Sequence, residues 1–210
     1  MYNENCYGII SISKEVNILE ENRDHTIETK FKKNCKLLVQ NKLPKWEELP
    51  DIGLYMDQLE KILNKYLSIY NDGDEEKLIT RAMINNYVKN GLIPKPEKKL
   101  YSRDHIAYLL VIGILKPVLS MSNIKEILMC QTGYRNSRDI LNLVYNILEL
   151  SSDFFIDKVA LKVESMLKVD GNSSVAFTSL AMTMGIISNT SRMVAVTALK
   201  TRKEWEENKK

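Results

Sequence analysis

The stretch "MINNYVKNGLIPKPEKKLYSRD", residues 83–104, contains the sharpest breaks in the sequence. Before the break, apolar residues recur at helical spacing: Met83, Ile84, Tyr87 and Val88. Thr80 precedes them as a suitable N-cap, and Gly91 follows where a helix commonly ends in the left-handed conformation. The prolines at 94 and 96 prevent the helix from continuing. The pattern therefore predicts a helix from Thr80 to Asn90 and an extended excursion over 92–101.

Helical patterns also flank this stretch. Residues 54–70, "LYMDQLEKILNKYLSIY", carry one apolar stripe and predict an amphipathic helix. Ser102 is expected to cap a helix that Pro117 stops after Leu115, and Ser120 or Ser122 to cap the next one. Further helical patterns cover 137–150, 153–168 and 174–206. No segment shows the sustained alternation of a strand, so the predicted fold class is mainly α.

The predicted order is helix, polar turn, helix, short basic excursion, helix, helix, which is the plan of a winged helix-turn-helix. The segments "MINNYVKNGLIPKP", "LYSRDHIAYLLVI" and "LSMSNIKEIL" resemble the DNA-binding domain of MerR-type regulators. In that family a recognition helix ends in Tyr-x-x-x-Gly-Leu, a wing ends in Tyr-Ser, and a Ser-Leu-x-x-Ile-Lys-x-Leu helix follows. The matching positions are Tyr87, Gly91, Leu92, Pro94, Tyr101, Ser102, Ile106, Leu109, Ser120, Ile124, Lys125 and Leu128. Two features depart from the family pattern: Asn85 replaces an arginine, and the turn before the helix has about ten residues instead of three or four.

The segments "LPKWEELPDIGLYMDQLEKIL", "LITRAMINNYVKNGLIPKP" and "KKLYSRDHIAYLLVIGILKPVLS" are also similar to a bacterial family, the one numbered 1836 among domains of unknown function. This resemblance covers roughly residues 43 to 130 and implies a transcriptional regulator. We therefore expect three parts. Residues 1–42 form an N-terminal arm with a short helix, 43–131 a MerR-like winged helix-turn-helix domain, and 132–210 a C-terminal helical bundle.

Basic residues concentrate between positions 77 and 103. Seven cations lie there, namely Lys77, Arg81, Lys89, Lys95, Lys98, Lys99 and Arg103, against the single acid Glu97, whereas the whole chain has a net charge of only +3. Such a concentration favours contact with DNA phosphates, because neutralised phosphates release counterions. The residues expected to contact DNA, from the resemblance and from charge together, are Thr80, Arg81, Asn85, Asn86, Tyr87, Lys89, Lys95, Lys98, Lys99, Tyr101 and Arg103. The expected partner is double-stranded DNA, with a recognition helix in the major groove and a wing against the backbone.

A second interpretation is a helical protein-interaction module whose basic face binds an acidic protein partner. Neither interpretation is enzymatic, because the sequence contains no phosphate loop, nucleophile elbow or zinc-hydrolase helix. No cofactor or metal is expected either. His25 and His105 are 80 positions apart, without a cysteine or acid at ligand spacing, and His105 is expected at the surface or as a helix cap.

Composition, with 44% apolar and 27% charged residues, indicates a soluble globular protein. A cytoplasmic location is expected from the cysteines, which have the pattern of reduced thiols, and from an N-terminus unlike a secretory signal. The three cysteines, Cys6, Cys35 and Cys130, are too far apart for a disulfide framework or a zinc site and are expected as reduced thiols. Residues 171–191 carry no charge but contain too many serines, threonines and asparagines for a lipid-facing helix. No signal sequence or membrane span is therefore expected.

The C-terminal third is apolar enough to need a core or a partner. Its apolar positions include Phe154, Phe155, Val159, Val163, Met166, Leu180, Met184, Ile187, Val194 and Leu199. The expected role is homodimerisation, because a two-fold dimer presents two recognition helices about one DNA turn apart. The methionines at 182, 184 and 193 also suit a small-molecule effector, whose identity the sequence does not give.

Overall fold

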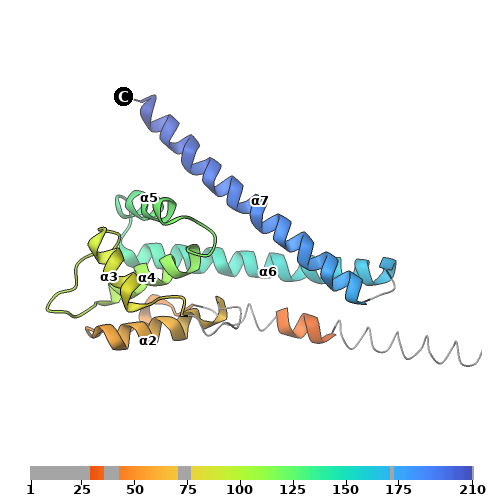
Figure 1. The fold of residues 1–210 in the computed structure, drawn as a ribbon, viewed down its shortest axis with the longest axis horizontal. Coiled ribbons are helices and arrows are strands. Elements are labelled where there is room, and N and C mark those ends of the chain that lie inside the picture. The colour runs from red at the N-terminus through yellow and green to blue at the C-terminus, as the bar shows by residue number, and fades with distance from the viewer. Residues whose placement is uncertain (1–28, 36–42, 71–76, 171–172, 210) are drawn as a thin grey trace, which may run out of the picture. The chain divides into compact units, whose positions relative to one another are not determined.

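The computed structural model of the chain describes residues 29–35, 43–70, 77–170 and 173–209 (Figure 1). Residues 29–35 are helical. The later elements are η1 (Trp46–Glu48), α2 (Met56–Leu67), η2 (Ser68–Tyr70), α3 (Arg81–Lys89), α4 (Arg103–Leu115), α5 (Met121–Thr132), α6 (Ser137–Asp170) and α7 (Ser173–Glu207). Within these described ranges there is no strand, only two isolated antiparallel bridges. The mainly α fold class is confirmed.

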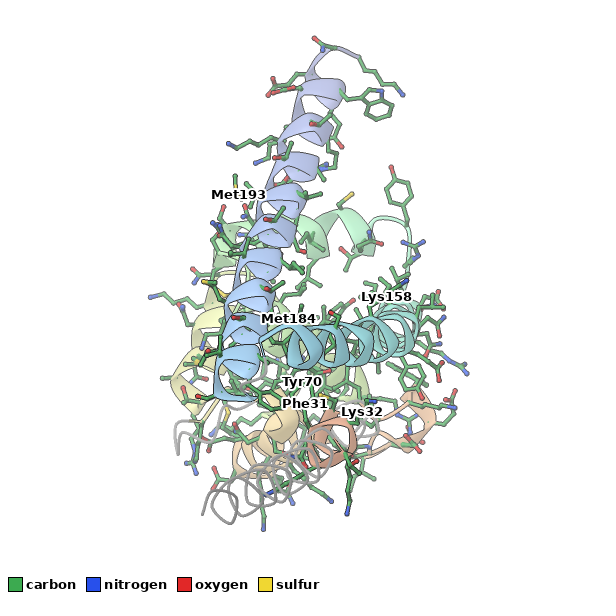
Figure 2. All side chains as sticks on the ribbon, turned by 90° about the vertical axis from the view of Figure 1, so that its right-hand side faces the viewer. Phe31, Lys32, Tyr70, Lys158, Met184 and Met193 are labelled. Carbon is green, nitrogen blue, oxygen red and sulfur yellow. The ribbon has the colours of Figure 1, made fainter. Side chains whose placement is uncertain are left out.

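The chain divides into two compact units. The larger one, called the core unit below, contains residues 41–151 and 187–210, and the second contains residues 1–40 and 152–186. In the second unit the ring of Phe31 (Figure 2) contacts that of Phe177, with centroids 5.2 Å apart, and Ala176 and Leu180 are buried. Phe31 and Cys35 lie in a short helix, as expected for part of residues 1–42. The rest of the expected N-terminal arm lies outside the described residues.

Helix α4 occupies the centre of the core unit. After its first turn, α4 is apolar on every side from Ile106 to Leu115 apart from the hydroxyl of Tyr108, as expected of a helix surrounded by neighbours. Four of its residues, Ile106, Leu109, Leu110 and Ile112, have no measurable exposure. Helix α2 packs closely against it, and a Cβ atom built on Gly113 of α4 would lie 2.4 Å from a methyl group of Leu67. Glycine at this position therefore permits the close approach of the two helices.

Most predicted helix ends agree with the structure. The Thr80 hydroxyl accepts a hydrogen bond from the Met83 N–H (3.3 Å), and Ser120, not Ser122, caps α5 through the Asn123 N–H (3.2 Å). Helix α4 ends at Leu115, as predicted. Gly91 has a φ of 65°. Trp46 is partly buried and packs against the core.

One expectation needs correction. The patterns over 137–150 and 153–168 predicted separate helices, but α6 runs unbroken from Ser137 to Asp170. Ser151 and Ser152 stand between the two predicted helices, and neither a glycine nor a proline is present there to end the helix. His105 was expected at the surface or as a helix cap. It takes part in the capping box of α4, whose N-cap is Ser102, and is 6% exposed.

None of the described helices is both long and apolar enough to cross a bilayer. Cys35 and Cys130 are free thiols, and Cys6 lies outside the described residues.

Candidate nucleic-acid interface

Helix α3 has a buried side and an exposed side. Ile84 and Tyr87 enter the core, at 0% and 4% exposure. The opposite face carries Arg81, Ala82, Asn85, Asn86 and Lys89, all exposed. Figure 1 shows α3, in yellow, at the same end of the core unit as α2 and α5. The exposed face is therefore held on a packed helix and presents mostly short side chains.

An ion-pair cluster attaches the beginning of α3 to α2. Glu60 is 7% exposed, and its two carboxylate oxygens bind Arg81 Nε (2.9 Å) and Lys77 Nζ (3.1 Å). Asp57, at the exposed edge, binds Arg81 Nη1 at 3.0 Å. The hydrogen bond from Arg81 holds the pKa of Glu60 below its usual range, against the opposing effect of burial. Arg81 and Lys77 are therefore already paired with acids of α2.

The segment that leads into α3 is held by two polar side chains. The Asn64 amide of α2 donates to the Ile79 carbonyl (2.7 Å) and accepts from the Ile79 N–H (3.3 Å). Lys116, at the end of α4, reaches the Leu78 carbonyl (3.5 Å) and the Met83 sulfur (3.2 Å). These contacts fix the start of α3 directly on α2 and α4, whatever the length of the turn that precedes it.

The end of α3 is a Schellman motif built on Gly91. The Gly91 N–H donates to the Val88 carbonyl (3.1 Å), and the Leu92 N–H donates to the Tyr87 carbonyl (2.8 Å). Lys125 of α5 then donates to the carbonyl of Asn90 at 3.0 Å. Side chains or backbone from α2, α4 and α5 thus hold both ends of the helix.

A tight turn over residues 97–100, called the basic turn below, follows α3. The Leu100 N–H donates to the Glu97 carbonyl at 2.7 Å, and Lys98 and Lys99 have φ angles of 48° and 66°. Positive φ at both central residues is the type I′ geometry, in which asparagine and glycine are preferred. Both lysines are exposed, as is Lys95.

The next residues anchor the basic turn. Tyr101 and Leu54 exchange two backbone hydrogen bonds of 2.9 Å, and the side chain of Tyr101 is 4% exposed. The guanidinium of Arg103 lies 5.5 Å from the centre of the Trp46 ring and binds Asp51 at 3.2 Å. The turn is therefore attached to the core unit by a short antiparallel pairing and by the contacts of the partly buried Arg103.

His105 completes the anchor. Its Nδ1 accepts a hydrogen bond from the Ser102 N–H at 3.0 Å, which forms a capping box at the start of α4. Its ring meets that of Tyr101 edge-on, with centroids 5.3 Å apart. Burial lowers the pKa of His105 below its usual range. In the part of the chain that the structure describes, no group of histidine, cysteine and acidic side chains is arranged to hold a metal ion.

The structure divides the eleven residues expected to contact DNA into two groups. The first group has exposed side chains that form none of the ion pairs described above: Asn85, Asn86, Lys89, Lys95, Lys98 and Lys99. The other five have structural contacts: Thr80 caps α3, Tyr87 and Tyr101 are buried, and Arg81 and Arg103 are paired with acids. The first group comes together on α3 and on the segment that follows it.

Sequence reasoning missed Ala82, which is exposed on the same face as Asn85. It also missed Glu60 and Asn64, which position α3. A signal for these two was present, because they are polar residues beside the apolar positions Leu59 and Leu63 of α2. A polar residue next to an apolar stripe indicates a buried partner, but the partner itself cannot be read from spacing.

Comparisons with known proteins gave one family match. No curated protein and no solved structure matched the chain significantly. The model of the family described as "Domain of unknown function (DUF1836)" matches residues 44–149, which span η1 to the first part of α6 and include the whole candidate interface. Since this match covers half of the chain, the protein belongs to the DUF1836 family.

Proposed function

We propose that the protein is a DNA-binding transcriptional regulator, with a MerR-like winged helix-turn-helix in which α3 is the recognition helix and the basic turn is the wing. The observation that carries the proposal is the exposed face of α3, with Asn85, Asn86 and Lys89, next to a turn that carries two exposed lysines. Asparagine is suited to bidentate hydrogen bonds with adenine in the major groove, and the lysines are suited to phosphates.

The support of α3 fits this role. A helix that reads base edges must hold its side chains in one position, and a helix held at both ends by neighbouring elements does so. The Glu60, Asn64 and Lys116 contacts at its start and the Lys125 contact at its end are of this kind. None of these side chains occupies the exposed face itself.

The backbone of the basic turn gives independent support. A non-glycine residue with positive φ is uncommon and strained, and Lys98 and Lys99 are two in succession. Asparagine and glycine would form the same turn with less strain. A strained conformation that is retained together with two exposed positive charges favours a role for those charges, and phosphate binding is such a role.

The charge that this proposal uses is smaller than the sequence indicates. Lys77, Arg81 and Arg103 are paired with acids, so the phosphate contacts fall to Lys89, Lys95, Lys98 and Lys99. Four contacts correspond to a slope of about −3.6 for the logarithm of the binding constant against the logarithm of salt concentration.

We also propose that the protein acts as a homodimer. A homodimer in a bacterial cytoplasm would present two copies of α3 to two half-sites. Exposed apolar side chains on the part of α7 in the core unit support self-association: Ile187, Met193 and Val194, of which Met193 is labelled in Figure 2. Burying such side chains against a second copy would stabilise a dimer.

The experiment that tests the proposal replaces the basic turn by the turn that its geometry prefers. Lys98→Asn with Lys99→Gly keeps the type I′ turn and removes both charges. We expect the free energy of unfolding to rise by about 0.5–1 kcal/mol, because the strain is relieved. We expect the affinity for random duplex DNA to fall at least about tenfold at low salt, with a salt slope weaker by about 2.

The matched control is Lys61→Gln with Lys65→Gln, which removes two exposed lysines from α2 instead. It should leave both the affinity and the slope close to those of the unaltered protein. Equal losses in the two double variants, or no loss in either, would remove the basic turn from the interface. If the unaltered protein binds no duplex even at low salt, an acidic protein partner becomes the better interpretation of the basic face.

A further inference from the structure

A groove lies on the core unit between the end of α3, α4 and α5. Its volume is about 540 Å³, which is within the range of sites for small ligands. It will be called the α3–α5 groove, and its lining includes Lys89, Leu92, Ile93, Lys95, Leu128 and Met129. The DNA-binding proposal uses only two of these residues, Lys89 and Lys95.

The floor of the groove is apolar and firmly held. Leu92, Ile93 and Leu128 belong to the hydrophobic core, at 9%, 3% and 3% exposure. Met129 of α5 stands beside them with 63% of its surface exposed. An exposed methionine next to a rigid apolar floor is typical of a surface that adapts to a ligand, because the thioether side chain is unbranched and flexible.

The charge of the groove has one sign. Lys89 and Lys95 are exposed, and none of the described residues that line the groove is an acid. The carboxyl-terminal end of α3, which would otherwise repel an anion, is covered because Lys125 binds the carbonyl of Asn90. An apolar floor with two lysines therefore favours a ligand that has an apolar body and one negative charge.

We propose that the α3–α5 groove binds a small amphiphilic anion, a carboxylate or sulfonate on an aliphatic or aromatic body. The body lies on Leu92, Ile93, Leu128 and Met129, and the anionic group pairs with Lys89 and Lys95. This binding does not depend on the proposed function of the protein.

One consequence does rest on the proposed function. Lys89 and Lys95 belong to the groove and to the proposed phosphate contacts, so the anion and DNA compete for the same two charges. Because linkage is reciprocal, a saturating anion weakens DNA binding by the same factor by which DNA weakens binding of the anion. The groove would then be the place where a small molecule releases the protein from DNA.

The test uses 1-anilinonaphthalene-8-sulfonate, an apolar anion that fluoresces when it is bound, with the full chain. We expect saturable binding that weakens at least about tenfold in Met129→Glu, because a carboxylate in the groove repels the sulfonate and competes with it for the lysines. The matched control is Ile147→Glu on α6, where an exposed apolar side chain of the core unit lies outside the groove. This variant should bind the probe as the unaltered protein does.

Two competitors of the same chain length, a carboxylate and an alcohol, test whether the ligand must carry a negative charge. Decanoate should displace the probe, whereas decanol at the same concentration should not. Unchanged binding in Met129→Glu, an equal loss in Ile147→Glu, or displacement by decanol would overturn the proposal. Circular dichroism of both variants checks that the helices are intact.

The same probe separates the two proposals. If both hold, a saturating concentration raises the Kd for random duplex at least about fivefold. Groove-dependent probe binding by a protein that binds no DNA would overturn the proposed function and leave the groove standing. DNA binding that the probe does not weaken would overturn the competition.

Discussion

At Lys98 and Lys99 an exposed positive charge is combined with a backbone conformation that does not suit lysine. Both have positive φ, where a lysine side chain is strained, and both keep their charge exposed. Two residues further along, Tyr101 is buried and pairs with Leu54. The strain at the tip is therefore tolerated because the base of the turn is firmly attached.

His105 should make the stability of the folded protein depend on pH in mildly acidic solution. Burial lowers the pKa of His105 in the folded protein, whereas in the unfolded chain its pKa is about 6.5. The unfolded state therefore binds more protons as the pH falls below about 6.5 towards the lower folded-state value. In that interval the free energy of unfolding should decrease as the pH falls. Above about pH 6.5 the contribution of His105 to stability does not change with pH.

The variant His105→Gln tests this prediction. Glutamine keeps an acceptor for the Ser102 N–H, as in a usual capping box, but it does not titrate. Urea unfolding at about pH 7.5 and about pH 5.5 should show a smaller loss of stability for His105→Gln than for the unaltered protein. The same loss in both proteins would show that His105 does not titrate in this range.

At the scale of elements, side chains of α2 hold the start of α3. Glu60 and Asn64, one helical turn apart, attach the start of α3 and the residue Ile79 before it. These are long-range contacts between polar side chains that lie beside an apolar stripe. The ends of α3 are thus fixed by specific hydrogen bonds as well as by the burial of Ile84 and Tyr87.

The variants Glu60→Gln and Asp57→Asn compare two acids that bind the same Arg81. Glu60 is buried and has two charged partners, so its replacement should lower the free energy of unfolding by about 1–2 kcal/mol. The Asp57 side chain is 72% exposed, so its replacement should change stability by less than about 0.5 kcal/mol. Urea midpoints measure both. Equal effects would contradict the assignment of Glu60 as the residue that positions α3.

Local signals were enough to predict most helix ends. Thr80, Gly91 and Ser120 act through atoms within a few residues of themselves, so their roles can be read from neighbouring sequence. The pairing of Arg81 with Glu60 joins residues 21 positions apart, and the sequence alone left Arg81 among the residues expected to contact DNA. The sequence was enough to select the six exposed candidates by their residue types. Only the three-dimensional contacts show which of the other cations are already paired with acids.

At the scale of the whole molecule, the family match and the candidate interface coincide. Residues 44–149 include α2 to α5, whereas α7 lies outside the match. In this account the matched part binds DNA, and α7 contributes exposed apolar side chains for self-association. Helix α6 runs from the matched part into the second unit as one continuous helix.

The central claim is that the chain binds double-stranded DNA through a small number of lysines. The most direct measurement is the affinity of the full chain for random-sequence duplex, titrated between about 50 and 200 mM salt. The account predicts binding at low salt with a slope of about −3 to −4 per chain, from Lys89, Lys95, Lys98 and Lys99. No binding at the lowest salt, or an affinity that salt does not change, would contradict it.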